Sequence, residues 1–366
     1  MPFTILSDNN VKSILSSLSK EEVLDLADIL QTTLTQHSTP SEFPHQPHRA
    51  VVTRDQQTTL FMPATTPSHS GVKIVGISPP GAPNAPPKPG LQASLTLCDS
   101  EGRAVGVLNA AEMTAFRTAL GSMLLYRQRR QTGNVVVFGA GAQARWHVRL
   151  ALLLRGDEIR RVTVVNRSRL RADELVAWLR AAGGVPAHVA LEVFDEREAE
   201  REALRERVQE AHVLFTAVPS ATPLFPAEWL MSDKVRARGR YIAAIGSYRL
   251  DMQELDPELL REMAAPSGLF QEVVWKGKVA VDSAEACLVE AGELVKAGIG
   301  REGMLEVGRV AEMRAGGSPQ EGLDEWLADG FVVYKSVGVG AMDIAIGSQL
   351  LELAGEKGVG VRLEDF

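Results

Sequence analysis

Residues 135–144 read Val135-Val136-Val137-Phe138-Gly139-Ala140-Gly141-Ala142-Gln143-Ala144. This apolar run of strand type leads into the pattern G-x-G-x-x-A, which is followed by a long helical pattern. Gly139 permits a tight turn, and Gly141 lets the backbone approach a pyrophosphate. The small residue Ala144 lets the helix pack closely on its strand, and the amide end of that helix then faces the anion. The stretch predicts a unit that binds a dinucleotide.

The next expected strand indicates which dinucleotide binds, because it ends in Asn166-Arg167-Ser168. Units that select NAD tend to end this strand in Asp or Glu, which binds the ribose 2′-hydroxyl, whereas an arginine suits a 2′-phosphate. The acid is absent here, and Arg167 lies between two small hydrogen-bonding residues. The sequence therefore predicts NADP(H), with NAD(H) the less favoured cofactor. For Arg169 and Arg171, a place on a solvated helix surface is an equally good interpretation.

Strand and helix patterns alternate through the middle of the chain. Helices are expected over 142–155, 170–181 and 197–211, and β-type segments over 161–165, 189–194, 213–218, 240–245, 271–275 and 279–281. This alternation predicts a parallel, doubly wound α/β sheet of Rossmann type. Its ligand should lie at the carboxyl ends of the strands, at 139–141, Asn166, 216–218 and 246–248.

About 130 residues precede this unit, and they have patterns of their own. A helix is expected after the capping signal Ser19-x-x-Glu22, and strands are expected over 49–53, 59–62, 72–77, 93–97 and 104–109. The proline-rich stretch 79–90 is interpreted as an exposed loop, and an apolar helix over 341–354 should pack back on this part. The predicted architecture is a split α+β domain, residues 1–130 plus 338–366, into which a Rossmann-type domain, residues 131–337, is inserted.

Length, net charge and cysteine content indicate which kinds of partner this protein should have. At 366 residues, 45% of them hydrophobic, the chain is long enough for two domains with cores. A net charge of -7 gives no reason to expect nucleic acid or an anionic membrane as partner, and the arginines near 127–130 and 201–207 are interpreted as solvated faces. No apolar run approaches the roughly 20 residues that span a bilayer. Two distant cysteines without metal-ligand spacing favour a cytoplasmic protein and no bound metal.

A set of short motifs is shared, in order and spacing, with a known family. They are His48-Arg49, Phe61-Met62-Pro63-Ala64, Gly71-Val72-Lys73, Thr114-Ala115-Phe116-Arg117-Thr118, the glycine loop, Ala244-Ile245-Gly246-Ser247, Glu290-Ala291-Gly292-Glu293 and Lys335-Ser336-Val337-Gly338. With these motifs, almost the whole chain resembles the ornithine cyclodeaminase and mu-crystallin family, which includes ketimine reductases and some alanine dehydrogenases. The resemblance also implies a homodimer formed through the first domain.

The resemblance assigns roles to particular residues. It implies that a substrate carboxylate binds Arg49, Lys73 and Arg117, which suits the two parallel hydrogen bonds of a guanidinium and the point charge of a lysine. Near two other cations the pKa of Lys73 should fall, which makes Lys73 a candidate proton donor or relay. The positions expected to bind the cofactor are Gly139, Gly141, Ala142, Gln143, Asn166, Arg167, Ser168, Thr216, Val218, Ser336 and Gly338.

Two departures from the family pattern bear on the reaction. Relatives that resemble ornithine cyclodeaminases carry an aspartate in the loop after Gly246, where this chain has Tyr248, and often an acid at the position of Leu60. Without these acids, partners for a second ammonium group and for an activated water are missing, so ornithine cyclodeamination is disfavoured. The pair Ser247-Tyr248 is closer to the mu-crystallin branch. We expect one of the two to line the substrate pocket, and Tyr248 is a candidate catalytic residue.

The leading functional hypothesis is an NADPH-dependent reductase of imines that carry an adjacent carboxylate. Such substrates are cyclic ketimines, or imines formed from a 2-oxo acid and an amine, and the C=N bond accepts hydride directly from nicotinamide C4. One alternative is an amino-acid dehydrogenase or an ornithine cyclodeaminase-like enzyme. Another is a mu-crystallin-like protein that binds NADPH and a small carboxylate ligand with little turnover.

Overall fold

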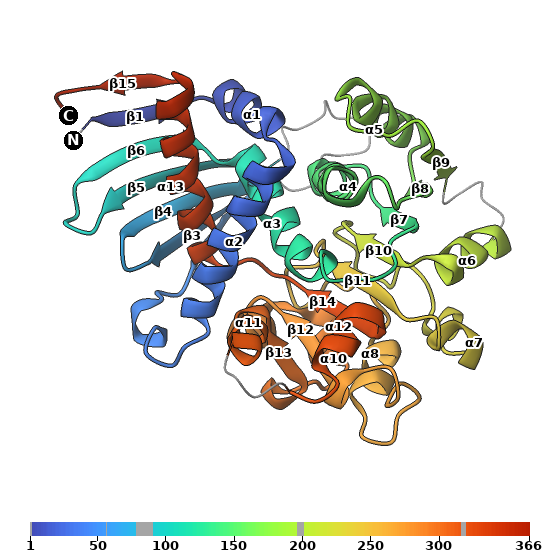
Figure 1. The fold of residues 1–366 in the computed structure, drawn as a ribbon. Helices are drawn as coiled ribbons and strands as arrows, with labels where there is room; N and C mark the ends of the chain where they lie inside the picture. Colours follow the sequence, from blue (N-terminus) through green and yellow to red (C-terminus); the bar gives the residue numbers. More distant parts are fainter. Residues whose placement is uncertain (1, 56, 78–90, 196–200, 316–319) are drawn as a thin grey trace. The chain divides into compact units, whose positions relative to one another are not determined.

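The computed structural model describes residues 2–55, 57–77, 91–195, 201–315 and 320–366 (Figure 1). The chain divides into two compact units, Met1–Arg117 with Val339–Phe366 and Thr118–Gly338. The first division falls inside helix α3 (Ala111–Tyr126) rather than after residue 130. The reason is that the first half of α3 binds the first unit through Arg117, whereas Ser122 and Tyr126 pack within the second.

The second unit is built on an eight-stranded sheet. Its strands are β7 (Asn134–Phe138), β8 (Arg161–Asn166), β9 (Ala190–Asp195), β10 (Val213–Thr216), β11 (Arg240–Ala244), β12 (Val279–Val281), β13 (Met304–Glu306) and β14 (Phe331–Lys335). The order is β13-β12-β14-β11-β10-β7-β8-β9, and the paired strands run parallel. The chain leaves β7 on one side and returns through β10 on the other, so the topological switch point lies between β7 and β10. The doubly wound fold is confirmed.

The helices of this unit are α4 (Ala142–Arg155), α5 (Arg169–Ala181), α6 (Arg201–Glu210), α7 (Asp233–Arg236), α8 (Pro257–Ala264), α9 (Ala284–Glu290), α10 (Gly292–Lys296), α11 (Val307–Ala315) and α12 (Leu323–Asp329). Helices α4 and α5 were expected at these positions, α6 lies within the third expected helix, and α7 to α12 were not predicted. Part of the helix expected over 197–211 lies outside the described residues. The strand expected over 271–275 is wrong, because a turn leads there into the 3-10 helix η3 (Trp275–Gly277), where Lys276 and Gly277 have positive φ.

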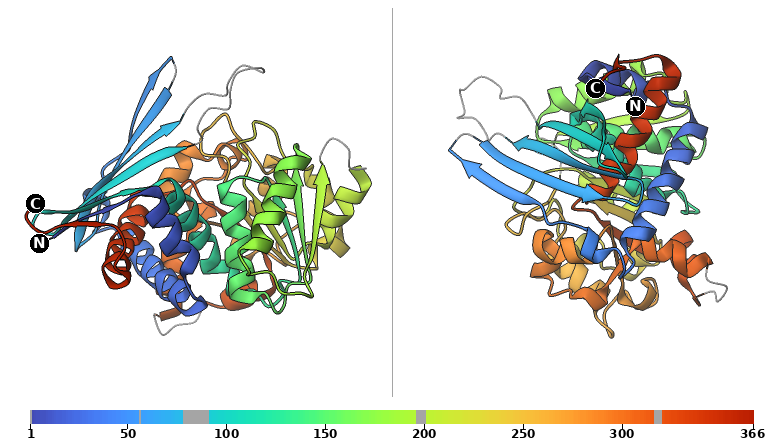
Figure 2. Two further views of the ribbon diagram at one scale, coloured as in Figure 1. Left: turned by 90° about the horizontal axis from the view of Figure 1, so that it is seen from above. Right: turned by 90° about the vertical axis from the view of Figure 1, so that its left-hand side faces the viewer.

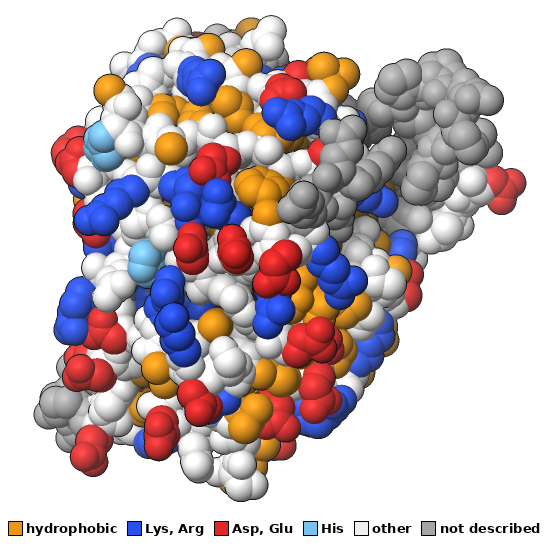
Figure 3. All heavy atoms as spheres, turned by 90° about the vertical axis from the view of Figure 1, so that its right-hand side faces the viewer, with side chains coloured by type: hydrophobic (Ala, Val, Ile, Leu, Met, Phe, Trp, Pro, Cys, Tyr) orange, Lys and Arg blue, Asp and Glu red, His pale blue; other side chains and the backbone are white. Residues whose placement is uncertain are grey.

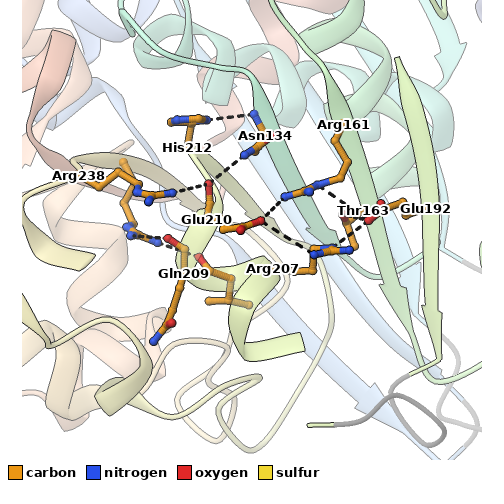
Figure 4. A network of polar contacts seen from close by, with 11 residues as sticks. Asn134, Arg161, Thr163, Glu192, Arg207, Gln209, Glu210, His212 and Arg238 are labelled. Carbon is orange, nitrogen blue, oxygen red and sulfur yellow. Dashed lines mark hydrogen bonds and ion pairs between the residues drawn. The ribbon is translucent and has the colours of Figure 1, made fainter. Parts of the chain in front are cut away.

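A polar network surrounds the amino ends of β7 and β8 (Figure 4). Glu210 of α6 accepts from Arg161 at 2.7 Å, and Glu192 of β9 accepts from Arg207 at 3.0 Å. Of the arginines near 201–207, Arg207 belongs to this network, at the end of the strands opposite to the expected ligand site, and Arg205 pairs with Glu202 on the same helix. Arg129 is different, because it is buried and donates to the carbonyl groups of Leu327 and Gly330 at the end of α12. The interpretation of a solvated face is therefore wrong for Arg129.

The first unit contains a seven-stranded sheet. Its elements are β1 (Phe3–Leu6), α1 (Asp8–Ser17), α2 (Lys20–His37), η1 (Phe43–His45), β2 (Ala50–Arg54), β3 (Gln57–Thr65), β4 (His69–Ile77), β5 (Gln92–Asp99), β6 (Ala104–Asn109), α13 (Gly340–Lys357) and β15 (Val361–Leu363). The strand order is β15-β1-β6-β5-β4-β3-β2, with β1 and β6 parallel and the other pairs antiparallel. Ser19 caps α2 as expected, whereas β1 and α1 were not predicted. The proline-rich loop over 79–90 lies outside the described residues.

Helices cover only one face of this sheet. Helix α13 packs against α2, β3, β4 and β5, as Figure 2 shows, so the expected return of the last helix to this unit is confirmed. Successive residues of a strand point to opposite faces. In β4 this puts Lys73 and Val75 under the helices, 1% and 2% exposed, and leaves Val72 and Ile74 on the open face, 38% and 41% exposed. The alternation thus fixes the side on which Lys73 is buried.

The surface shows no dominance of one charge on the face drawn in Figure 3, where acidic and basic side chains are interspersed. Within the part of the chain that the structure describes, no helix is both long and apolar enough to cross a membrane. The same part contains no group of three or more His, Cys, Asp or Glu side chains that would hold a metal ion.

Candidate active site

Three buried ionic side chains meet in the first unit. Lys73 Nζ of β4 lies 2.6 Å from Asp343 Oδ2, and Arg117 Nε of α3 lies 2.9 Å from Asp343 Oδ1. Their side chains are 1%, 4% and 1% exposed. The structure therefore brings together Lys73 and Arg117, two of the three cations expected to bind a carboxylate, and adds an acid between them.

Local packing explains how α13 delivers Asp343 to this place. A Cβ at Gly340 would lie 2.8 Å from the Cβ of Ala64, and a Cβ at Gly71 would lie 2.8 Å from a side-chain carbon of Ile344. The glycines thus let the first turn of α13 lie directly on β3 and β4. Because Asp343 is in that turn, its carboxylate reaches the strand face that carries Lys73.

The electrostatics of this cluster centre on Lys73. Burial lowers the pKa of Lys73 to about 7, Asp343 acts to raise it, and Arg117 and Arg49 lower it further. The expected fall in this pKa is confirmed, but its largest cause is desolvation rather than the neighbouring cations. Arg49 is half-buried just before β2, and its effect on Lys73 shows that its charge is near.

Sequence reasoning missed Asp343. The signal was an acid in an otherwise apolar helical run, Ala341-Met342-Asp343-Ile344-Ala345. A fully buried carboxylate is costly unless it is paired, so its place in the apolar pattern was a sign of a partner cation. Only the crossing of β4, α3 and α13 shows which cations those are.

The glycine loop of the second unit fits a dinucleotide. Gly139 has φ +105°, and a Cβ there would lie 2.8 Å from the carbonyl oxygen of Ala217. Gly141 is the N-cap of α4 without a side-chain cap, and a Cβ there would meet nothing within 4 Å. The first amide groups of α4, starting at Ala142, therefore have room for an anion.

Two buried polar atoms nearby also lack partners. Thr216 Oγ1, at the carboxyl end of β10, and Gln143 Oε1, in the first turn of α4, make no hydrogen bond to the residues that the structure describes. Buried polar atoms without a partner are rare in proteins. Both positions were expected to bind the cofactor, and both offer it a polar atom.

The end of β8 presents Arg167 to solvent. Asn166 Nδ2 donates to the Ser168 carbonyl at 2.9 Å, and Ser168 Oγ caps α5 by accepting from the Arg171 amide. These bonds shape the turn, and Arg167 is exposed and unpaired among the described residues. Arg169 instead pairs with Asp173 at 3.6 Å, which agrees with the surface interpretation for that residue.

The segment after β14 is held by Asp282. Asp282 Oδ2 accepts from Ser336 Oγ and from the Gly338 amide, both at 2.7 Å. Asp282 is fully buried and was not predicted. The expectation that Ser336 and Gly338 bind the cofactor stays a prediction, and Asp282 is the side chain to which both donate hydrogen bonds.

A second buried group surrounds Ser247. Its hydroxyl donates to Glu293 at 2.6 Å and accepts from Lys335 Nζ at 2.6 Å, and the three side chains are at most 1% exposed. Because this hydroxyl is engaged and buried, it does not suit the pocket-lining role considered for it. Tyr248, the next residue, is half-buried in the loop after β11, and its catalytic role stays a prediction.

Comparison with known proteins agrees with this arrangement. A Delta(1)-pyrroline-2-carboxylate reductase of Bacillus cereus is 27% identical over 320 residues, covering 85% of this chain and 86% of the relative. The ketimine reductase mu-crystallin of Mus musculus is 27% identical over 259 residues, covering 70% and 67%. An archaeal alanine dehydrogenase, solved as a dimer with bound NAD, has a TM-score of 0.74 at 22% identity and covers all of both chains; this likeness shows the fold.

A family model that matches most of the sequence identifies the family of this chain. The model of the ornithine cyclodeaminase/mu-crystallin family matches residues 7–313, which include Arg49, Lys73, Arg117 and the glycine loop. With the parallel sheet, the glycine turn and the buried cations in place, this match establishes that the chain belongs to the ornithine cyclodeaminase/mu-crystallin family.

Proposed function

We propose that this protein is a nicotinamide-dependent reductase of imines that carry a carboxylate next to the C=N bond. The observation that carries the proposal is the buried cluster of Lys73 and Arg117 around the single carboxylate of Asp343. Two cations in a desolvated place favour a small anion as partner. The names of the pyrroline-2-carboxylate reductase and of the ketimine reductase mu-crystallin support the same class of substrate.

Three residues have separate roles in the proposed reaction. Arg117 and Arg49 bind the substrate carboxylate by charge-assisted hydrogen bonds and thereby fix the position of the neighbouring imine carbon. A bound nicotinamide would supply the hydride that converts the C=N bond into CH–NH. The nitrogen needs one proton, and Lys73, whose pKa is about 7, gives it near neutral pH and regains it from solvent.

A panel of substrates tests the proposal through the absorbance of the reduced nicotinamide. We expect rapid oxidation of the cofactor with preformed cyclic ketimine carboxylates, such as pyrroline-2-carboxylate and piperideine-2-carboxylate, or with imines of 2-oxo acids and amines. Turnover of pyruvate that depends on ammonia would instead indicate an amino-acid dehydrogenase. Tight cofactor binding without turnover of any of these substrates would indicate a binding protein and contradict the proposal.

Ornithine cyclodeamination is the less favoured reaction. Asp251 is the acid nearest in sequence to Tyr248, but it is exposed and paired with Arg249 at 2.8 Å. It is therefore engaged elsewhere and is a poor substitute for the aspartate that this loop lacks. Release of ammonia from ornithine in the presence of NAD would show that this interpretation is wrong.

We further propose NADP(H) as the cofactor, on the basis of Arg167. The exposed guanidinium at the end of β8 suits a 2′-phosphate. Replacing Arg167 with Ala should raise KM for NADPH about 10- to 100-fold, the effect of losing a charge-assisted hydrogen bond, and leave KM for NADH unchanged. Arg169→Ala is the matched control, because Arg169 is on the same turn but paired with Asp173. Equal use of both cofactors by the wild type would contradict this assignment.

The open face of the first unit supports a homodimer. Val52, Phe61, Val72 and Ile74 lie on the face not covered by helices and are 45%, 38%, 38% and 41% exposed. Grouped apolar side chains on a sheet face indicate a surface that another protein covers. We propose that a second copy of the chain covers it. Sedimentation of the purified protein as a monomer at micromolar concentration would contradict this.

A further inference from the structure

Glu254 is a buried carboxylate between two loops at the carboxyl edge of the parallel sheet. It lies in the loop between β11 and α8 and is fully buried. Its Oε1 accepts from the Val218 amide at 2.7 Å. Its Oε2 accepts from the amides of Gly246 and Ser247 at 2.6 and 3.2 Å. One side chain thus binds the loop after β10 and the loop after β11.

Backbone bonds strengthen this link. The Leu224 amide donates to the Glu254 carbonyl at 2.9 Å, and the Gln253 amide donates to the Ser220 carbonyl at 2.7 Å. Gly246 lies directly on Val218, because a Cβ at Gly246 would collide with the backbone of Val218. The loop over 217–224 is therefore held by the segment 253–254 along much of its length.

This loop borders the switch point at which the dinucleotide is expected. β10 neighbours β7 in the sheet, and Gly139 after β7 lies so close to Ala217 that a Cβ there would be 2.8 Å from the Ala217 carbonyl oxygen. A shift of the backbone at 217–218 would therefore change the width of the glycine turn. It would also move Thr216, whose buried hydroxyl is without a partner in the described structure.

We propose that Glu254 is a positioning residue for dinucleotide binding: its carboxylate holds the backbone of the loop after β10 against the loop after β11, in the place where this loop borders the cofactor. The inference rests on the proposed function for the identity of the ligand. It assigns no contact between Glu254 and the ligand, because the carboxylate acts through the amides of Val218 and Gly246.

The protonation state of Glu254 provides a specific signature. Burial raises the pKa of Glu254 to about 7, and repulsion from Glu293 of α10 adds to this, whereas Lys335 of β14 and the amide donors lower it. Below this pH the carboxyl group is protonated, and one oxygen becomes a donor that faces amide donors. The loops should then lose one of their bonds to Glu254, and cofactor affinity should fall as the pH falls through about 7.

The test is the Kd of NADPH, measured by nicotinamide fluorescence without substrate from about pH 5.5 to about pH 8.5, a range that spans the pKa of Glu254. We expect Glu254→Gln to raise Kd about 10- to 100-fold at pH 8, because an amide accepts at one atom only. Protonation of the 2′-phosphate of NADPH should weaken binding at low pH equally in both proteins. The additional rise in Kd that comes from protonation of Glu254 should occur only in the wild type. Glu306→Gln is the matched control: Glu306 is also buried, but it is the last residue of the outermost strand β13 and accepts from one amide, that of Ala284.

The outcomes separate the two proposals. An unchanged Kd and an unchanged pH profile in folded Glu254→Gln would overturn the role of Glu254, as would an equal loss of affinity in Glu306→Gln. If Glu254→Gln does not fold, Glu254→Asp is used, whose shorter side chain keeps the charge but cannot reach both loops; wild-type affinity in that variant would also overturn the proposal. A wild type that binds neither NADPH nor NADH would contradict the proposed function itself.

Discussion

Arg117→Ala is expected to reduce kcat/KM for carboxylate-bearing imines by about 100- to 1,000-fold or more. The physical reason is the loss of the guanidinium, which offers two parallel charge-assisted hydrogen bonds to a carboxylate in a desolvated place, each worth roughly 1.5–3 kcal/mol. Arg117 also pairs with Asp343 at 2.9 Å, so its removal leaves a buried acid with Lys73 as its remaining ion-pair partner among the described residues. Steady-state kinetics with pyrroline-2-carboxylate measure the effect.

The control for Arg117 uses the substrate rather than the protein. A cyclic imine without the carboxylate cannot use the guanidinium, so Arg117→Ala should turn it over at nearly the wild-type rate. Loss of stability would lower the turnover of both substrates equally. Loss of carboxylate binding would lower only the turnover of the substrate that carries the carboxylate. The same preference for the carboxylate substrate in the wild type and the variant would show that Arg117 does not bind this group.

Asp343→Asn is expected to move the active pH range to lower values. In the wild type, kcat/KM should fall as the pH rises through about 7, where Lys73 loses its proton. Asp343 is the neighbour that raises the pKa of Lys73, whereas burial, Arg117 and Arg49 all lower it. Without the aspartate charge the pKa falls below 7, so the alkaline fall of activity starts earlier. A shift of about one pH unit corresponds to about tenfold lower activity at pH 8.

Three further variants test whether this pH shift comes from the charge of Asp343. Asp343→Glu keeps the charge and should restore most of the wild-type profile, and Lys73→Met should remove the alkaline limb altogether. Asp173→Asn, on the surface of α5, should change nothing. If Asp343→Asn lowers activity equally at every pH, the aspartate only holds the cluster together and does not set the charge of Lys73.

Local sequence patterns determined the fold of the second unit. The run 135–144 predicted β7, the glycine turn and α4, and α4 begins and ends as expected, at Ala142 and Arg155. Such patterns are reliable because a glycine turn and an apolar strand depend on neighbours in sequence. The segment 271–275 shows the limit: Val274 and Trp275 are buried, but the left-handed Lys276 and Gly277 end any extended pairing there.

Only the tertiary structure showed which charged side chains meet in the candidate site. The family resemblance implied Arg49, Lys73 and Arg117, but it did not imply Asp343. Asp343 and Arg117 are 226 residues apart in sequence and form an ion pair in the folded chain. Glu254 and Asp282 were also missed. Sequence alone suggests that an acid in a loop is exposed to solvent, and only the folded structure shows the amide groups that it binds. Sequence determines which side chains exist and which local backbone they favour. Whether a carboxylate is buried, and which cation or amide it binds, follows from distant segments that meet only in the folded chain.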